Sequence, residues 1–331
     1  RDRSVSRGLG DVYKRQVINS KAGKSVLEFA RRFRPDIIHE NSSVTGIGYY
    51  VARRLDLPLV MHIREYADKD FKIYLLNYRR RLRYHKTYPV AITRDLAEYR
   101  CVRLGIGREP RVIYNGIIDG RAMALPEKKH PFFLYAGRIE PNKGIEDLID
   151  AYIGYRSHRD SEGKVIKLKI AGAYLRKAFF DSLRQKVVQA GLSDDVAWLG
   201  ECSGMDELYS EAAATIIPSY CEGFGRIPPE AMASGSLCVM RDAGGLKEQL
   251  DNGVSVSGDE IALRFTTVAQ LEECLTLIAE DYFTSASCAG SRFFPMMRRA
   301  QATVVRLYSK KAHCDNFMSL YDEILNQSKI K

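Results

Sequence analysis

The chain has 331 residues, of which 45% are hydrophobic and 28% are charged. This length predicts about two domains, and this composition excludes a globally disordered protein. No apolar run approaches the roughly 20 residues that span a bilayer, which argues against an integral membrane protein. The seven cysteines are scattered without a Cys-x-x-Cys pair. That pattern argues against a disulfide framework or a structural zinc site and fits a reducing cytoplasm.

The net charge of +10 is unevenly distributed along the chain. Residues 1–16 carry a net charge of +3, residues 17–130 carry +11, and residues 131–331 carry −4. This asymmetry predicts an anionic partner or surface for the first half of the chain only.

The first residues have neither helical nor strand periodicity. Within them SRGLGDVYKRQ (6–16) resembles the translation of a widely used transposon sequencing adapter. We interpret residues 1–16 as read-through from a metagenomic DNA library, and we expect the gene to be cut at its 5′ end. A natural basic tail is the alternative.

From residue 17 on, predicted helices alternate with predicted strands. In the first half, helices are expected over 24–34, 48–55 and 95–104, and strands over 36–39, 58–63, 88–93 and 111–114. After residue 131, strands are expected over 132–136, 167–171, 196–199, 215–217 and 237–240, and helices over 145–155, 177–190, 205–213, 230–234 and 246–250. Such alternation is typical of parallel sheets covered by helices on both faces.

This pattern predicts two doubly wound, Rossmann-like α/β domains that face each other across a cleft. We assign residues 17–119 to the first domain, 120–131 to a linker and 132–315 to the second domain. Residues 316–331 are predicted to form a C-terminal helix that returns to the first domain. The first strand of the first domain, with its Gly-rich loop, is missing from the pattern, so we expect that domain to be incomplete.

Four segments of the second half share one design, in which an apolar strand runs into glycine or proline before a helix. They are Ala136–Arg138 with Lys143-Gly144, then Ala171-Gly172, Pro218–Gly225 and Ala243–Gly245. Loops of this kind lie at the carboxyl edge of a parallel sheet, where glycine admits a ligand to the backbone and helix N-termini attract phosphate. Any one of them alone is explained equally well by turn chemistry.

Charged residues near these loops point to a phosphorylated ligand. Arg138 and Lys143 flank one turn, so both can reach an anion held there; two solvated surface cations are the alternative. Glu222 and Glu230 are separated by seven residues across a loop and a helix start. A carboxylate at that place can accept hydrogen bonds from the hydroxyls of a ribose, although an ordinary acid near a helix N-terminus is the alternative.

Taken together, these runs resemble a known family. YAGRIEPNKGIEDLIDAY (135–152), PSYCEGFGRIPPEAMASG (218–235) and AGGLKE (243–248) are similar to the retaining glycosyltransferases of family 4, the group 1 glycosyltransferases, which have the GT-B fold. RPDIIHENS (34–42) and VIYNGI (112–117) resemble that family's first domain. The resemblance is strong over residues 132–250 and weaker but continuous over 26–131.

The resemblance implies a donor site for a nucleotide-diphosphate sugar. Its expected residues are Gly137, Arg138, Lys143, Glu222, Gly223, Phe224, Gly225 and Glu230. Arg138 and Lys143 match the pair that holds the diphosphate, Glu222 the acid near the transferred sugar, and Glu230 the acid that binds the ribose. Arg138, Lys143 and Glu222 are therefore the expected catalytic residues. No metal and no cofactor is expected, because fixed cations stabilise the departing diphosphate.

By the same resemblance, the expected reaction transfers a sugar, with retention, to a glycan or lipid-linked saccharide in cell-surface polysaccharide biosynthesis. A nucleotide-sugar epimerase of the same fold and a non-catalytic nucleotide-sugar-binding subunit are the alternatives. Because both halves of such an enzyme close around the donor, we expect a truncated chain to be poorly active or inactive.

The sequence departs from the family pattern at two places near the expected donor. Ala171-Gly172 leads into Ala173-Tyr174 where the family usually has a second glycine, which is expected to narrow the nucleotide side of the pocket. In the first domain, Arg64 stands where the family often has a histidine, with His62 two residues earlier. His62 and Arg64 are therefore candidates for a first-domain pocket, and a purely structural histidine is the alternative.

The segment Phe71–Tyr88 (FKIYLLNYRRRLRYHKTY) is the most basic stretch and has aromatic residues interleaved. On one helix it would present Arg79, Arg80, Arg83 and Lys86 beside tyrosine and leucine, a pattern suited to anionic lipid headgroups. We expect it to contact the inner face of the cell membrane from the cytoplasm. A solvated helix face or a site that steers an acidic acceptor are alternatives, and no nucleic-acid-binding module is present.

Overall fold

A computed structural model describes residues 21–66, 78–101, 109–158 and 164–329. The chain divides into two compact units, the first formed by residues up to Tyr114 and from Asp315 onward, the second by Asn115–Cys314. The predicted adapter read-through (1–16) lies outside the described residues. Residues 120–131, predicted as a linker, belong to the second unit. The domain limits drawn from the sequence stay predictions.

The first unit is built on a four-stranded parallel sheet in the order β1-β2-β3-β4. Its strands are β1 (Ile38–Glu40), β2 (Leu59–Ile63), β3 (Thr87–Ala91) and β4 (Arg111–Val112). Its helices are residues 21–33, α2 (Ile47–Leu55), α4 (Tyr78–Leu82), α5 (Arg94–Arg100) and the part of α13 (Lys310–Lys329) from Asp315 on. Helix α5 begins after Thr93 because the Thr93 hydroxyl accepts a hydrogen bond from the Leu96 amide at 3.2 Å.

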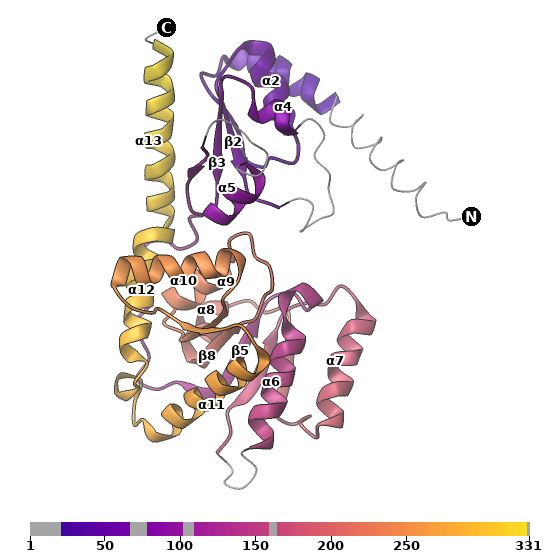
Figure 1. The fold of residues 1–331 in the computed structure, drawn as a ribbon, viewed down its shortest axis with the longest axis vertical. Coiled ribbons are helices and arrows are strands. Elements are labelled where there is room, and N and C mark those ends of the chain that lie inside the picture. The colour runs from indigo at the N-terminus through magenta and orange to yellow at the C-terminus, as the bar shows by residue number, and fades with distance from the viewer. Residues whose placement is uncertain (1–20, 67–77, 102–108, 159–163, 330–331) are drawn as a thin grey trace, which may run out of the picture. The chain divides into compact units, whose positions relative to one another are not determined.

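Helices cover both faces of this sheet, and Figure 1 shows α13 and α2 on opposite sides of β2 and β3. On one face, Phe317, Leu320 and Ile324 of α13 are buried against Val60 and Val90. On the other face, α2 packs with the helix of residues 21–33. Both faces of the sheet are therefore apolar, as the continuous apolar run of β2 predicts.

The second unit is built on a six-stranded parallel sheet in the order β10-β9-β8-β5-β6-β7. Its strands are β5 (His130–Ala136), β6 (Lys167–Ala171), β7 (Val196–Gly200), β8 (Ala212–Ile217), β9 (Cys238–Arg241) and β10 (Leu263–Phe265). Its helices are α6 (Ile145–Ser157), α7 (Lys177–Gln189), α8 (Met205–Glu211), α9 (Ile227–Ala233), α10 (Gly244–Ser257), α11 (Val268–Thr284) and α12 (Phe294–Tyr308), with the start of α13.

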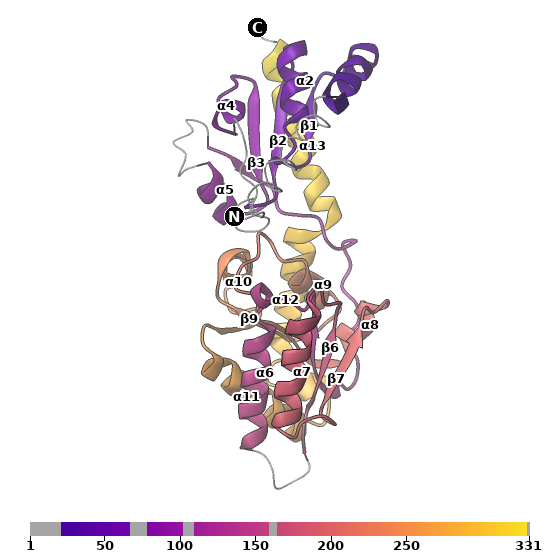
Figure 2. The same ribbon diagram turned by 90° about the vertical axis from the view of Figure 1, so that its right-hand side faces the viewer.

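The order of strands reverses within this sheet. From β5 the chain adds β6 and then β7 on one side, and it afterwards returns to add β8, β9 and β10 on the other side. Figure 2 shows β6 and β7 beside each other. Helix α11 comes after the last strand and packs along α6 (Figure 1). Gly154 of α6 permits this packing, because a Cβ atom there would lie 2.2 Å from Glu272 Oε2 of α11.

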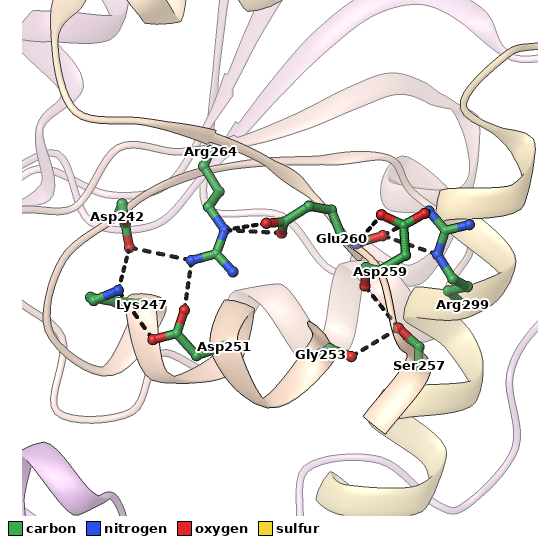
Figure 3. A network of polar contacts seen from close by, with 9 residues as sticks. All are labelled: Asp242, Lys247, Asp251, Gly253, Ser257, Asp259, Glu260, Arg264 and Arg299. Carbon is green, nitrogen blue, oxygen red and sulfur yellow. Dashed lines mark hydrogen bonds and ion pairs between the residues drawn. The ribbon is translucent and has the colours of Figure 1, made fainter. Parts of the chain in front are cut away.

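A network of charged side chains fixes α10 to the neighbouring strands (Figure 3). The Arg264 guanidinium donates to both carboxylate oxygens of Glu260 at 2.9 Å and to Asp251 Oδ1 at 2.7 Å. Lys247 lies 3.1 Å from Asp251 and 3.6 Å from Asp242. Because Lys247 and Asp251 both lie on α10, the network holds the helix that starts in the loop Ala243–Gly245.

Most predicted elements lie within a few residues of the observed ones, and β6 has the predicted bounds. The basic segment is different. Helix α4 ends at Leu82, so Arg83 and Lys86 lie beyond it, and Arg81 points inward, where it donates to the Ser43 carbonyl at 2.8 Å. The prediction of one helix that presents all four cations is wrong over residues 78–88. Residues 71–77 lie outside the described residues.

Lys129 is a buried cation whose titration can be followed. Its ammonium donates to the carbonyls of Ser210 and Gly235, at 2.5 and 2.7 Å, and only 7% of the residue is exposed. Burial lowers the pKa of Lys129 to about 8, against about 10.4 in an unfolded chain. Between these values the unfolded chain binds the extra proton, so the free energy of unfolding should rise with pH.

We therefore predict that wild-type protein gains up to about 3 kcal/mol relative to Lys129→Met between pH 8 and pH 10.4. This is an upper limit, because the two carbonyl acceptors favour the charged ammonium. Urea unfolding of both proteins across this pH range measures the difference between their free energies of unfolding. Tyrosines and cysteines titrate in both proteins, so their contributions cancel in this difference. A flat difference would contradict the prediction.

Candidate functional site

The site residues expected in the second unit follow the two strands at which the strand order reverses. Strand β5 lies between β6 and β8, and the loops after β5 and β8 leave the same edge of the sheet. In open parallel sheets, ligands bind outside the carboxyl ends of the strands at such a reversal. Here the loop after β5 carries Arg138 and Lys143, and the loop after β8 carries Glu222.

Lys143 and Glu222 contact each other directly. The Lys143 ammonium lies 2.6 Å from Glu222 Oε1, and the two side chains are 17% and 16% exposed. Lys143 ends a short 3-10 turn (Pro141–Lys143), 79 residues before Glu222. The expected diphosphate cation and the expected sugar carboxylate are thus brought together. An ammonium has three donors, so Lys143 can hold Glu222 and still donate to an anion.

The loops after β5 and β8 meet backbone to backbone at Gly144. This residue has φ +66°, and a Cβ atom there would lie 2.0 Å from the Pro218 carbonyl oxygen. The Tyr220 amide also donates to the Asn142 carbonyl at 3.1 Å. Because only glycine fits this approach, the turn that carries Lys143 is fixed against the loop that carries Glu222.

Arg241 supports the same junction between the two loops. The sequence analysis did not single it out as a site residue. It is the last residue of β9 and is 6% exposed. Its guanidinium donates to the Pro218 carbonyl at 2.8 Å and to the Asp147 carboxylate, and it lies over the Tyr220 ring at 4.3 Å. An arginine that ends an apolar strand was the available signal, since a buried charge needs several partners.

The segment Glu222–Gly225 is held by the loop and helix that follow β9. The Gly245 amide donates to the Glu222 carbonyl at 2.9 Å, and a Cβ atom on Gly245 would lie 2.8 Å from the Gly223 carbonyl. Gln249 donates to the Gly225 carbonyl at 2.9 Å, and the Phe224 ring is buried against Tyr308. The expected sugar loop is therefore a packed structure rather than a free turn.

Gly137 and Arg138 are the first two residues of the loop after β5. Gly137 has φ +138°, and the Tyr135 hydroxyl donates to the Arg138 carbonyl at 2.7 Å. The Arg138 side chain is 56% exposed and lies 3.3 Å from Glu140. In the described part of the chain, Arg138 therefore pairs with Glu140 and not with the Lys143–Glu222 pair.

Glu230 lies in the first turn of α9, which follows the loop after β8. Its carboxylate lies 3.1 Å from the Arg226 guanidinium. Burial raises the pKa of Glu230 above its usual range, while Arg226 opposes this shift. This half-buried acceptor lies in the first turn of the helix that follows the loop of Glu222.

His62 and Arg64 lie in the first unit, where both contact Asn41. His62 is in β2, is 1% exposed, and has Nδ1 3.2 Å from Asn41 Oδ1. Arg64 donates to the same oxygen at 3.3 Å. Asn41 was not singled out in the sequence, although it follows β1 in a turn-rich stretch.

No group of three or more His, Cys, Asp or Glu side chains among the described residues is placed to hold a metal ion. None of the described helices has the length and apolarity that crossing a bilayer requires.

The Gly144 junction can be tested by a matched pair of glycine substitutions. Gly191 has φ +72°, close to that of Gly144, but a Cβ atom there would meet nothing within 4 Å. Gly191→Ala should therefore lose only about 1 kcal/mol from backbone strain. Gly144→Ala adds a backbone clash and should lose at least about 2 kcal/mol more. Chemical denaturation measures both, and equal losses would contradict the constraint.

Two family models match most of the chain. The family model described as glycosyl transferases group 1 matches residues 121–286, and the model described as glycosyltransferase family 4 matches residues 3–121. The lipopolysaccharide core biosynthesis mannosyltransferase LpsB of Rhizobium meliloti is 32% identical over 126 residues, which cover 38% of this chain and 35% of that protein. An uncharacterized glycosyltransferase of Methanocaldococcus jannaschii is 27% identical over 66% of this chain and 61% of its own length. The chain thus spans about a third of the first relative and less than two thirds of the second.

Solved structures share the fold at low identity. The Anabaena protein HepE in complex with UDP has a TM-score of 0.71 and 20% identity, over 91% of this chain and 82% of that chain. A glycosyltransferase from Rickettsia africae has a TM-score of 0.74 and 16% identity, over 93% and 82%. Together with the two parallel sheets, these neighbours confirm the predicted GT-B fold with two Rossmann-like domains. With a family model that matches half of its residues, the chain belongs to the group 1 glycosyl transferases.

Proposed function

We propose that this chain is part of a glycosyltransferase whose second unit binds a nucleotide-diphosphate sugar, and that the sugar is transferred with retention to a glycan or lipid-linked saccharide. The observation that carries the proposal is the 2.6 Å contact between Lys143 and Glu222 at the reversal of the strand order. It joins a cation suited to phosphate with a carboxylate suited to sugar hydroxyls. Relatives named as mannosyltransferases of lipopolysaccharide core and O-antigen chains support the acceptor class.

Each residue of the site has a chemical role in this proposal. Lys143 and Arg138 neutralise the diphosphate as it departs, which stabilises developing negative charge without a metal ion. Glu222 orients the hydroxyls of the transferred sugar, and Glu230 accepts hydrogen bonds from the ribose. HepE, whose fold is shared, was solved with UDP and with UDP-glucose, which supports a nucleotide sugar as the donor.

Transfer from a panel of GDP- and UDP-sugars to saccharide acceptors, followed by mass spectrometry, tests the proposal. We predict that Lys143→Ala loses about a hundredfold or more in rate, as removal of a charge-stabilising donor does. Glu230→Ala should lose about tenfold or more in kcat/KM, because the hydrogen bonds from the ribose to a charged group are lost. Activity should persist in EDTA. Lys167→Ala, at the opposite end of β6, is the matched control and should keep wild-type activity.

Several outcomes would contradict the proposal. Unchanged rates in both active-site variants would remove the site assignment. Conversion of the donor without an acceptor would indicate an epimerase, and tight nucleotide binding without turnover would indicate a non-catalytic binding subunit.

We also propose that the first unit contacts an anionic membrane surface. Arg53, Arg79, Arg80 and Arg83 line one shallow hollow with Tyr49, Tyr84 and His85. No carboxylate pairs with these four arginines among the residues that the structure describes, whereas His85 lies 3.9 Å from Asp56. Unpaired arginines beside aromatic rings suit lipid phosphates.

Vesicle sedimentation tests this contact. Each basic residue near an anionic surface contributes about 1 kcal/mol, so the triple variant Arg79→Ala, Arg80→Ala, Arg83→Ala should bind phosphatidylglycerol vesicles about a hundredfold more weakly. The control Arg176→Ala, Lys177→Ala, Arg184→Ala removes three exposed cations from the second unit and should bind normally. Equal binding to neutral phosphatidylcholine vesicles, or equal losses in both variants, would contradict a specific surface.

A further inference from the structure

A hollow lies at the carboxyl edge of the six-stranded sheet, the edge that carries the Lys143–Glu222 contact. It is beyond the ends of β6 and β7. Its volume is about 290 Å³, and its walls include Ile139, Tyr174, Phe180 and Trp198. The pair of strands below it, β6 and β7, lies on the opposite side of β5 from β8. The hollow is therefore distinct from the Lys143–Glu222 contact but opens on the same edge.

The hollow borders the turn that carries Arg138. Ile139 follows Arg138 directly, and its amide donates to the Ala173 carbonyl at 2.8 Å. Gly172 permits the two loops to approach closely, because it has φ +150° and a Cβ atom there would lie 1.8 Å from the Gly137 carbonyl. If the diphosphate is held by Arg138 and Lys143, as proposed above, the neighbouring hollow is the space available to the base.

The aromatic side chains of the hollow suit a flat ring. Tyr174 and Phe180 are stacked, with ring centroids 4.4 Å apart and planes 7° from parallel. Trp198 meets Phe180 edge to face at 5.0 Å. Tyr174 remains 43% exposed, which leaves surface of this side chain for contact with a further aromatic ring. Stacking on such a platform accepts any base and does not select among them.

Selection would come from Glu201, the one charged residue among those that line the hollow in the described part of the chain. Glu201 directly follows Gly200 at the end of β7 and is exposed. Among the described residues, no hydrogen bond or ion pair engages its carboxylate. An ionised carboxylate only accepts hydrogen bonds, and it accepts two parallel donors best.

We propose that the nucleotide donor of this site carries guanine, and that Glu201 selects it. The Watson–Crick edge of guanine presents two adjacent donors, N1–H and the N2 amino group, which match the two oxygens of a carboxylate. Uracil presents a single N–H between two carbonyl oxygens, which a carboxylate repels. Adenine and cytosine place a ring-nitrogen acceptor beside their amino group. This inference rests on the proposed nucleotide-sugar site and names its base.

Trp198 provides the measurement, because it is the single tryptophan of the chain and lines the hollow. Titrations of the full chain with GDP, IDP and UDP, followed by tryptophan fluorescence and calorimetry, compare the bases at constant diphosphate. We expect GDP to bind at least tenfold more tightly than UDP. Inosine lacks the N2 amino group, so IDP should bind about tenfold more weakly than GDP, the loss of one hydrogen bond to a charged group.

Glu201→Gln should reduce the preference for GDP over UDP to within about threefold, because it weakens GDP binding and removes the repulsion of the uracil carbonyl oxygens. Glu211→Gln, which replaces an acid at the end of α8 that lies 3.7 Å from His130, is the matched control and should keep the full preference. UDP binding as tight as GDP in wild type, or an unchanged preference in Glu201→Gln, overturns the guanine assignment while the nucleotide site stands. Failure of every nucleoside diphosphate to bind, with Lys143→Ala identical to wild type, overturns the proposed function and this inference together.

Discussion

The approach of two backbones at Gly144 and Pro218 is the constraint on which the second unit's site depends. The Pro218 carbonyl is engaged from one side by the buried Arg241 guanidinium and is approached from the other by the turn at Gly144. A buried guanidinium is costly unless several acceptors surround it, and the Asp147 carboxylate and the Thr266 carbonyl complete its shell. These contacts fix the distance between the turn that carries Lys143 and the loop that carries Glu222. Charged groups that are fixed before a ligand arrives need little reorganisation when it binds.

The order of the strands explains why residues so distant in sequence meet. A chain that adds two strands to one side of β5 and three to the other must leave two loops at the centre of one sheet edge. Both loops carry glycine with a positive φ at a crowded position, since a Cβ atom would meet the Pro218 carbonyl at Gly144 and the Leu246 side chain at Gly225. The ion-pair network around Arg264 secures α10, and α10 in turn holds the Gly223–Gly225 segment through Gly245 and Gln249. The site is thus supported by the sheet order and by α10, not by the two loops alone.

Sequence reasoning succeeded where short-range pattern decides the structure. Apolar runs between turn residues predicted β2 and β6 almost to the residue. It failed where tertiary packing decides. Helix α10 runs to Ser257 although only 246–250 was expected, because Gly253 and the serines after it weaken the helical pattern, while Ile261 packs closely on Gly253. The long helices α11 and α12 were not assigned at all.

The candidate site likewise contains residues that the sequence predicted and residues that it did not. Lys143, Glu222 and Glu230 were predicted because their spacing resembles a family motif, and the motif states which residues matter without stating what holds them. Arg241 and Asn41 were missed because each acts through partners 20 to 100 residues away, as Arg241 does on Asp147 across 94 residues. No window of sequence shows such a pairing. The direction of Arg81, which turns inward to Ser43 in a run of otherwise exposed arginines, is likewise a property of the packed unit.

Net charge is a poor guide to where a polyanion binds in this chain. The basic half carries the larger positive charge, yet the residues suited to a diphosphate lie in the half whose net charge is −4. Binding of a phosphate group depends on a few cations and amides at fixed positions, whose interaction falls off within about 10 Å in physiological salt. Acidic residues of the second unit that lie farther away than this are therefore largely screened from the site. The two carboxylates at the site are each paired with a cation, Glu222 with Lys143 and Glu230 with Arg226.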